Sequence, residues 1–510
     1  MYDPPVGPGR GREFTLALAT ISISLDEPIA VIRPELHGHF AEHLGGCIEG
    51  GIWVGEDSAI PNLGGIRSDV LEALSRIRPP VIRWPGGCYA DDYHWEDGVG
   101  PRKERPRRVN LWWGQNIETN HFGTHEFLQL CRYLGAEPYL AGNLGSGSVR
   151  EMRDWMEYCN FAGDSTLARR RAGNGSPVPF GVRYWGVGNE NWGCGGNFCP
   201  EDYAAEYKRY ATYLRGFSGV NPFLIACGPD GNNADWTRRF FSKLGRFPHI
   251  HGYAAHYYCG TAGASATEFD VNQWYELLEK AARMEDLVVQ QRALMDGFDP
   301  EGKIGLVVDE WGTWHFPTPG HHPLHLWQQN TLRDALAAAI TLDVFHRHAD
   351  KLVMANLAQM ANVLQALVLT EGDRMVLTPT YHVFDLYQSH RGGRSLRMMI
   401  DAPAIAFAAG DERRQIAGLS GSASIKGDML TLTVVNPHAS LPQDARVQLD
   451  NSATIAEAVA TVLTHEDPAA HNTFADAQTV RPKACDTELV GTGRHLFQPR
   501  SVTAIKARIK

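Results

Sequence analysis

VRYWGVGNENWG (Val182–Gly193) carries an apolar run into a turn rich in Gly and Trp, with Glu190 at the junction, and KIGLVVDEWGTW (Lys303–Trp314) repeats this pattern around Glu310. Both glutamates follow strand-like segments. In a barrel of parallel strands, catalytic side chains come from the C-terminal ends of the strands. The two segments therefore predict a barrel whose mouth presents two carboxylates.

The neighbouring sequence supports this prediction, because apolar segments alternate with segments of helical period. The predicted strands are Glu35–Glu42, Pro80–Pro85, Glu137–Asn143, Val182–Glu190, Phe223–Asp230, His251–Tyr258, Lys303–Glu310 and Leu352–Gln359. The predicted helices include Ser68–Ile77 with Ser68 as N-cap, Thr124–Leu134, Glu201–Phe217, Trp274–Leu294 and Thr331–His348. Eight strand and helix units predict an α/β fold, the (β/α)8 TIM barrel.

After about Ser389 the pattern changes to short alternating runs, such as Met429–Val435 and Ala445–Leu449, separated by Gly, Asn, Asp and Pro. This pattern is typical of an antiparallel β-sandwich, here of jelly-roll type. The run Thr15–Leu25 also alternates, and we expect it to add a strand to that sandwich. The predicted domains are residues 1–27 (the N-terminal strand), 28–389 (the barrel) and 390–510 (the β-sandwich).

Composition excludes several classes of protein. The chain has 510 residues, 43% of them hydrophobic, which is enough for a large core and a second domain. A net charge of −10 argues against nucleic acid as a partner, since phosphate binding requires a basic face. No apolar stretch is long enough to predict a membrane span.

The cellular location of the protein is predicted from its N-terminus and its cysteines. MYDPPVGPGRGREF (Met1–Phe14) lacks the apolar core of a signal peptide. The nine cysteines are odd in number and scattered, a pattern that favours reduced thiols over a disulfide framework. We therefore expect a cytoplasmic protein.

Glu190 and Glu310 would end the fourth and seventh strands, which lie across the barrel mouth from one another. A single glutamate at a strand end is as often a surface residue as a catalytic one, but two flanked by Trp and Gly favour catalysis. Paired carboxylates about 5–5.5 Å apart can cleave a glycosidic bond with retention of configuration. The amide of Asn189 is suited to hold a sugar 2-hydroxyl.

Several long motifs resemble glycoside hydrolase family 51. They are His37–Trp53, Arg83–Arg102, Asn120–Cys131, Glu137–Gly145, Trp185–Gly196, Asp309–Trp314 and Met354–Thr370, and together they cover the barrel. Members of this family are chiefly retaining α-L-arabinofuranosidases with a clan A barrel, a C-terminal β-sandwich and often a hexameric assembly. The resemblance implies catalysis without a cofactor or metal.

The resemblance also implies roles for individual residues. Glu190 in GNE matches the general acid/base, and Glu310 in DEW matches the nucleophile. Asn189 matches the amide that contacts the 2-hydroxyl, and Glu42 matches a carboxylate that binds the furanose hydroxyls. The candidate substrate-binding residues are Glu42, Cys88, Asn189, His256, Tyr258, Trp311, Trp314 and Gln359, with Trp311 or Trp314 as an apolar wall.

Cys88 departs from the pattern of many members, which carry PGGNF where this chain has PGGCY. A thiol cannot reproduce the donors and acceptor of an amide, so sugar recognition should differ in detail. Cys88 as a nucleophile is the less favoured alternative, because two well-placed glutamates are present.

Other motifs are interpreted as structural. The loop Trp314–His325 holds four histidines, but their spacing matches no zinc pattern, and we expect a mobile polar loop over the site. Cys194 and Cys199 lack a second ligand pair and are expected to be reduced. Trp112 and Trp113 could stack on a second sugar ring or pack against a neighbouring subunit.

The favoured function is an exo-acting α-L-arabinofuranosidase that works on arabino- or arabinoxylo-oligosaccharides as a homo-oligomer, a hexamer or a trimer. The same chemistry also fits a β-D-galactofuranosidase, a β-xylosidase or an endo-β-1,4-glucanase. Two other classes stay open: a non-catalytic carbohydrate-binding barrel protein and a metal-dependent hydrolase, the latter supported only by the histidine loop.

Overall fold

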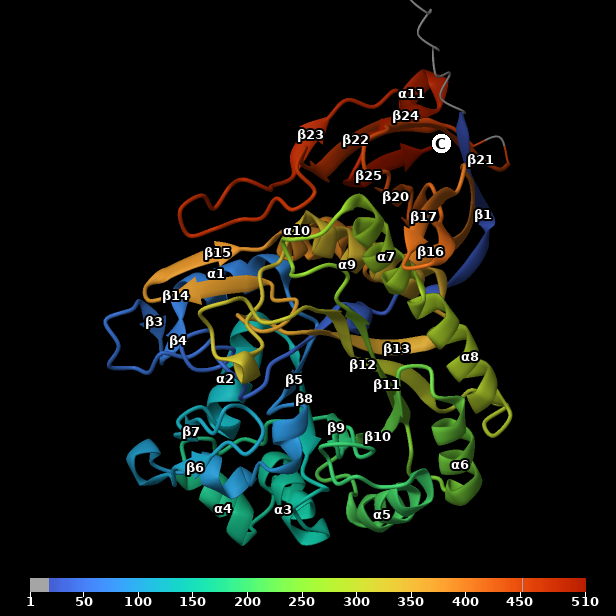
Figure 1. The fold of residues 1–510 in the computed structure, drawn as a ribbon. Helices are drawn as coiled ribbons and strands as arrows, with labels where there is room; N and C mark the ends of the chain where they lie inside the picture. Colours follow the sequence, from blue (N-terminus) through green and yellow to red (C-terminus); the bar gives the residue numbers. More distant parts are fainter. Residues whose placement is uncertain (1–17, 452) are drawn as a thin grey trace, which may run out of the picture.

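The structure is a computed structural model that describes residues 18–451 and 453–510. It consists of a barrel and a sheet domain, with helices between them (Figure 1). Of the predicted N-terminal strand Thr15–Leu25, the first three residues lie outside the described part of the chain.

Eight strands form a closed barrel in which every pairing is parallel, so the predicted TIM barrel is confirmed. The predicted first strand was wrong at its start, because Pro34–His37 forms a 3-10 helix with proline in its first turn. In order of sequence the barrel strands are β2 (Gly38–Phe40), β5 (Val81–Trp84), β8 (Glu137–Gly142), β9 (Tyr184–Val187), β10 (Phe223–Asp230), β11 (Gly252–Gly260), β12 (Gly305–Trp314) and β13 (Leu352–Ala358).

The helices mostly follow the predicted pattern, and two of them match it to the residue. Among the described residues, no helix combines the length and the apolar character needed to cross a membrane. The helices are α1 (Ser68–Ile77), α2 (Thr124–Leu134), α3 (Val149–Asn160), α4 (Thr166–Gly173), α5 (Pro200–Tyr213), α6 (Ala234–Leu244), α7 (Val271–Ala282), α8 (Met284–Asp296), α9 (Leu332–Arg347), α10 (Pro379–Tyr387) and α11 (Leu489–Thr492).

Three helix predictions were wrong in detail. Arg67, with a non-helical ψ of 127°, is the N-cap of α1, so Ser68 already lies inside the helix. The predicted helix Trp274–Leu294 is two helices, α7 and α8, which meet at Arg283. The third, α5, ends four residues before Phe217, which instead bridges Val220 in a turn.

The sheet domain contains nine strands and includes the predicted N-terminal strand. β1 (Ala19–Val31) pairs antiparallel with β16 (Arg394–Asp401) and parallel with β21 (Gln443–Leu449). The C-terminal strands pair antiparallel with one another, so the predicted antiparallel domain with an added N-terminal strand is confirmed. Apolar side chains from eight of these strands share one core, as the two faces of a sandwich do. The other strands are β19 (Ser420–Lys426), β20 (Met429–Asn436), β22 (Ile455–Thr464), β23 (Lys483–Cys485), β24 (Arg494–Phe497) and β25 (Ser501–Ile509).

Four two-stranded hairpins lie outside the barrel and the nine-stranded sheet. β6 (Arg108–Val109) and β7 (Ile117–Glu118) form a hairpin after β5 that carries the two adjacent tryptophans. The remaining pairs are β3 (Asn62–Leu63) with β4 (Ile66–Arg67), β14 (Val368–Glu371) with β15 (Arg374–Leu377), and β17 (Ile405–Ala409) with β18 (Glu412–Ile416).

Helices α9 and α10 fill the junction between the barrel and the sheet domain (Figure 1). The junction has a polar interior. His346 on α9 contacts His37 at 2.9 Å and Ser422 of β19 at 3.0 Å. His390 bonds to Ser424, also of β19, at 2.8 Å. All of these side chains are buried, so hydrogen bonds between domains replace those that water would otherwise supply.

Candidate active site

The two glutamates lie at the C-terminal mouth of the barrel, as predicted. Glu190 follows β9 after Gly188 and Asn189 and has a positive φ of 39°, a conformation that few residues other than glycine adopt. Glu310 lies within β12, where the pairing register with β11 shifts. One carboxylate oxygen of Glu190 lies within 4.8 Å of one of Glu310. This separation brings both carboxylates to one small substrate.

Glu310 is 5% exposed, accepts two hydrogen bonds and has one further cationic neighbour. Arg83 donates from Nη1 to Oε1 at 2.8 Å, and the hydroxyl of Tyr258 donates to Oε2 at 2.7 Å. His256 Nδ1 lies 3.6 Å from Oε2. Burial by itself would raise the pKa of Glu310, but the charges of His256 and Arg83 and the hydrogen bonds outweigh it, and the pKa is lowered. Glu310 is thus kept ionised.

Glu190 has a different environment. His256 forms an ion pair with it, with Nδ1 2.9 Å from Oε1. Around the other oxygen lie the sulfur atoms of Cys88 at 3.8 Å and Cys194 at 3.5 Å. Burial, aided by the negative charge of Glu310, raises the pKa of Glu190 despite the bond to His256. The pocket therefore shifts the pKa values of the two carboxyls in opposite directions, that of Glu190 upward and that of Glu310 downward.

A third carboxyl, Glu42, follows β2 and is 2% exposed. Its Oε1 accepts from the backbone N–H of Tyr89 at 3.0 Å and from the indole of Trp113 at 2.9 Å. Its Oε2 accepts from Gln359 at 3.1 Å. Burial, together with the charge of Glu310, raises the pKa of Glu42 to about 7. The structure thus brings Glu42 and Gln359 together beside the two glutamates, as the sequence predicted.

Three buried polar atoms of predicted sugar-binding residues have no partner among the described residues. Nδ2 of Asn189 and Oε1 of Gln359 lie at the site, whereas the third, Nε1 of Trp311, belongs to a ring packed on the outside of the barrel. An unpaired buried donor or acceptor costs roughly 1–3 kcal/mol, so such atoms persist where a ligand supplies the missing bond. One donor and one acceptor of this kind suit the hydroxyl groups of a sugar.

Arg83 is a functional residue that the sequence reasoning missed. Its guanidinium donates to Glu310 and, through Nη2, to the side-chain oxygen of Asn189. Its Nε lies 3.4 Å from Asp309, which in turn accepts from Tyr139 at 2.7 Å. The RWPGG motif could have indicated it, because it places an arginine in a predicted barrel strand. A buried arginine requires carboxylate partners, so such a residue predicts an ion pair inside the barrel.

The structure separates the two candidate tryptophans. Trp311 is 1% exposed and packs against Phe345 of α9 and Phe384 of α10, on the outside of the barrel. Successive residues of a strand point to opposite faces, so Trp311 points away from the pocket into which Glu310 points. Trp314 is 36% exposed and lies edge to face with Tyr258, at 5.0 Å between ring centroids. Of the two, only Trp314 reaches the site.

The prediction that Cys88 and Cys194 are reduced was wrong. They form a disulfide beside Glu190, and the seven remaining cysteines are free. The two residues are 106 positions apart and come from the loops after β5 and β9. Barrel closure brings these loops together, and nothing in the local sequence indicates that. A disulfide wall therefore stands where many family members have an asparagine.

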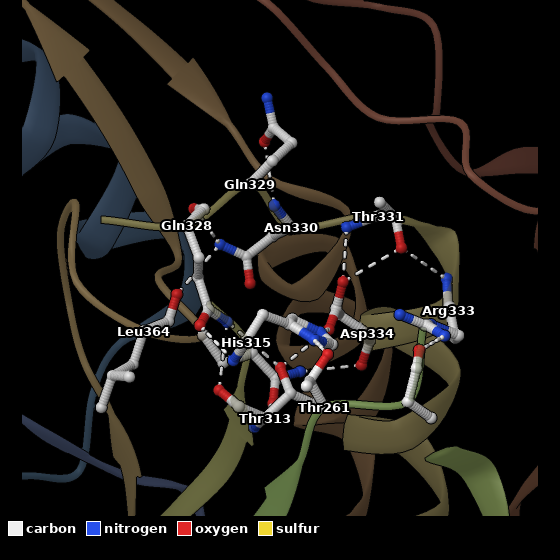
Figure 2. A network of polar contacts seen from close by, with 12 residues as sticks. Thr261, Thr313, His315, Gln328, Gln329, Asn330, Thr331, Arg333, Asp334 and Leu364 are labelled. Carbon is white, nitrogen blue, oxygen red and sulfur yellow. Dashed lines mark hydrogen bonds and ion pairs between the residues drawn. The ribbon is translucent and has the colours of Figure 1, made fainter. Parts of the chain in front are cut away.

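The histidine loop after β12 was predicted to be mobile, but buried contacts anchor it. Figure 2 shows His315 buried against Asp334, which accepts from its Nε2 at 2.8 Å, while Thr261 contacts its Nδ1 at 2.9 Å. His321 stacks on Trp327, and His325 bonds to Asn116 of the β6–β7 hairpin at 2.9 Å. Within the described residues, the two clusters of three potential metal ligands both contain Glu190 and neither contains a histidine of this loop. The loop anchors one rim of the mouth.

Comparison with protein families agrees with this site. The family model of the alpha-L-arabinofuranosidase 1 domain matches residues 73–269, which include Arg83 and Glu190. The model of the alpha-L-arabinofuranosidase C-terminal domain matches residues 309–501, which include Glu310 and most of the sheet domain.

Individual relatives match over nearly the whole chain. The intracellular exo-alpha-L-arabinofuranosidase of Bacteroides ovatus is 43% identical over 469 residues, 91% of this chain and 90% of that protein. The crystal structure of the GH51 arabinofuranosidase from Xanthomonas axonopodis pv. citri is 41% identical, with a TM-score of 0.93 over 96% of this chain and all of that one. An arabinose complex of the Thermotoga maritima α-L-arabinofuranosidase is 31% identical, with a TM-score of 0.84 over the same shares. The chain therefore belongs to the α-L-arabinofuranosidases of glycoside hydrolase family 51.

Proposed function

We propose that the protein is a retaining exo-α-L-arabinofuranosidase that releases terminal arabinofuranose from arabino- and arabinoxylo-oligosaccharides. The observation that carries this proposal is the approach of Glu190 and Glu310 within 4.8 Å, with their pKa values shifted in opposite directions. An inverting enzyme needs a wider gap to admit water between the carboxyls. The names of the relatives favour arabinofuranose as the sugar.

In the first step Glu310 attacks the anomeric carbon while Glu190 gives its proton to the leaving oxygen. Tyr258 and Arg83 hold the two oxygens of Glu310 and so orient it for attack. In the second step Glu190, now ionised, takes a proton from water as the water displaces Glu310. His256 contacts Glu190 in this state and stabilises its charge.

The sugar would be bound by the groups that surround the two carboxyls. The free donor of Asn189 would bind the 2-hydroxyl, next to the nucleophile. Glu42, Gln359 and Trp113 would bind the hydroxyls at the far side of the ring. The disulfide between Cys88 and Cys194 would form an apolar wall near the leaving oxygen.

The test is hydrolysis of 4-nitrophenyl α-L-arabinofuranoside beside the β-D-galactofuranoside, β-D-xyloside and β-D-glucoside, in the presence of a chelator. We expect rapid release from the first substrate only, unaffected by the chelator and abolished by Glu310→Ala. The configuration of the first-formed sugar, followed by NMR, should match that of the substrate. Release from another glycoside instead would mean that the enzyme is specific for that sugar. Inversion of configuration would exclude the double displacement. Loss of activity in chelator would support a metal-dependent hydrolase. No hydrolysis of any glycoside would favour a binding protein.

The location and assembly belong to the same proposal. We infer a cytoplasmic enzyme acting on imported fragments, since the Bacteroides ovatus relative is named intracellular. A homo-oligomer, a hexamer or a trimer, is proposed from the family resemblance. Cell fractionation tests the location, and light scattering of the purified protein tests the assembly, where a monomer would contradict it.

A further inference from the structure

Asp91 is a buried carboxylate that the mechanism above does not use. It ends the short helical turn Cys88–Asp91 after β5 and is 4% exposed. It does not contact Glu190 or Glu310 directly. Its side chain instead joins the ends of two other barrel strands, β8 and β9.

One oxygen of Asp91 is held by the segment that follows β8. Oδ1 accepts from the backbone N–H groups of Leu144 at 2.7 Å and Gly145 at 2.8 Å. The backbone carbonyl of Asp91 accepts from the N–H of Ser146 at 3.1 Å and from its hydroxyl at 2.9 Å. Asp91 is thereby fixed to a rigid part of the barrel.

The other oxygen is held by the segment that carries Glu190. Oδ2 accepts from the backbone N–H of Asn189 at 2.8 Å and faces the side-chain amide of Asn191 at 3.4 Å. The residues immediately before and after Glu190 thus share one buried acceptor. Glu190 itself has a positive φ of 39°, which a residue with a side chain keeps only where its neighbours are held.

From this geometry we propose that Asp91 is a positioning residue for the general acid/base, because its carboxylate fixes the Asn189–Asn191 turn and so sets the place of the Glu190 carboxyl. The inference rests on the proposed carboxylate mechanism but does not depend on which sugar is cleaved. A displacement of about 1 Å of a catalytic group can reduce a rate by about 100-fold. Such a displacement would affect proton transfer at Glu190 more than attack by Glu310, which lies on another strand and is held by Arg83 and Tyr258.

The first test variant is Asp91→Asn, which keeps the size of the side chain. It turns one oxygen into an NH2 group, so a donor then faces an N–H of either Asn189 or the loop after β8. The matched control is Asp92→Asn, the same change one residue along on a half-buried side chain that makes none of these contacts. Both variants are compared with the wild type on aryl glycosides of the sugar that the wild type releases.

We expect kcat/KM of Asp91→Asn to fall about 100-fold when the leaving phenol is weakly acidic and less than about tenfold when it is strongly acidic, since only the former needs a proton from Glu190. Azide should accelerate turnover of the strongly acidic substrate and give the glycosyl azide. Azide forms a bond to the anomeric carbon as the bond to Glu310 breaks, and no proton is needed. Asp92→Asn should behave as the wild type on both substrates and with azide.

A second variant covers the case in which Asp91→Asn does not fold. Gly195 is buried beside this junction, and a Cβ there would lie 2.5 Å from Oδ2 of Asp91 and would overlap the carbonyl oxygen of Asn189. Gly195→Ala therefore disturbs the same contacts without changing a charge. It should show the same dependence on the leaving group and the same acceleration by azide.

The proposal is overturned if a folded Asp91→Asn protein loses the same factor on both leaving groups and does not respond to azide. It is also overturned if that variant keeps wild-type activity. If Asp91→Asn does not fold, the proposal is overturned when Gly195→Ala shows no dependence on the leaving group. A wild type that hydrolyses a different glycoside from the one proposed would change the sugar used in these assays and nothing else.

Discussion

The hydroxyl of Tyr258 donates to Oε2 of Glu310 at 2.7 Å, so a neutral donor stabilises the charge of the proposed nucleophile. Tyr258→Phe removes this donor and should raise the pKa of Glu310, since the hydrogen bond favours the ionised form. Because attack requires the carboxylate, the acidic limb of the kcat/KM profile should move to higher pH, by about one unit for one such bond.

The control for this profile is Tyr257→Phe, since that hydroxyl donates to the carbonyl of Lys280, away from the site. Its acidic limb should match that of the wild type. An unchanged limb in Tyr258→Phe would mean that Glu310 does not govern the acidic side of the profile.

The two tryptophans of β12 should respond differently to truncation. Trp311→Ala empties a buried space among Phe345 and Phe384 and should lower the free energy of unfolding by about 3–5 kcal/mol. Trp314→Ala removes a partly exposed ring beside Tyr258 and should instead raise KM, with a change in the free energy of unfolding below about 1 kcal/mol. Urea unfolding and steady-state kinetics on both variants check this, and a reversed pattern would move Trp311 into the pocket.

The disulfide between Cys88 and Cys194 predicts a thiol count. Denatured, unreduced protein should take up alkylating reagent at seven cysteines, and reduced protein at nine. Mass spectrometry of the peptides should find Cys88 and Cys194 unlabelled in the first sample. Nine labelled cysteines without reductant would mean that both residues face Glu190 as free thiols.

Acid should weaken the junction between the barrel and the sheet domain. Burial lowers the pKa of His390 to about 3 and that of His346 well below its usual range. A histidine whose pKa is lowered on folding stabilises the protein fully above the unfolded pKa of about 6.5 and progressively less as pH falls toward the folded value. At pH 5 the loss is roughly 2 kcal/mol for each such histidine.

Other groups at the junction act on this balance. His37 and His39 have lowered pKa values for the same reason and add to the loss, and the nearby charge of Arg391 also disfavours their protonation. Asp343 opposes it, because burial raises its pKa to about 6 and the folded protein then gains stability as pH falls below that value. At the junction one carboxyl opposes four histidines. Glu42 and Asp91, whose pKa values burial raises to about 7, oppose them in the barrel, so stability should fall, but by less than the sum of the four losses.

Urea unfolding at pH 7 and pH 5 measures this effect. His390→Asn should reduce the difference in unfolding free energy between the two pH values. His322→Asn, a change on an exposed side chain of the loop after β12, should not. Equal stability of the wild type at both pH values would contradict the prediction.

The barrel could be predicted because each strand ends in a local signal. Gly, Pro, Asn or an acid follows each apolar run, so the centres of all eight strands were predicted correctly. The predicted bounds were wrong where the apolar pattern gives no signal of a break. Pro34–His37 forms a 3-10 helix at the start of the predicted first strand, and α7 ends near Arg283 within a continuous helical period.

The site was predictable where residues project from strand ends and not where loops meet. Glu190 and Glu310 follow from their strands, Glu42 and Gln359 from the family resemblance, and the structure brings them together. The pairing of Cys88 with Cys194 and the contacts of Asp91 depend on loops that only barrel closure brings together. No spacing rule links such positions in the sequence.

The place of β1 in the sheet domain also bears on how the protein is made. β1 lies between β16 and β21, so the first described strand finds both of its partners only after most of the chain has left the ribosome. At about 5–20 residues per second that delay lasts tens of seconds. During this time the strand exposes Ile21 and Ile23, which are buried in the finished core, to pairing with other chains. Efficient production of the enzyme should therefore depend on holdase chaperones that cover this strand during translation.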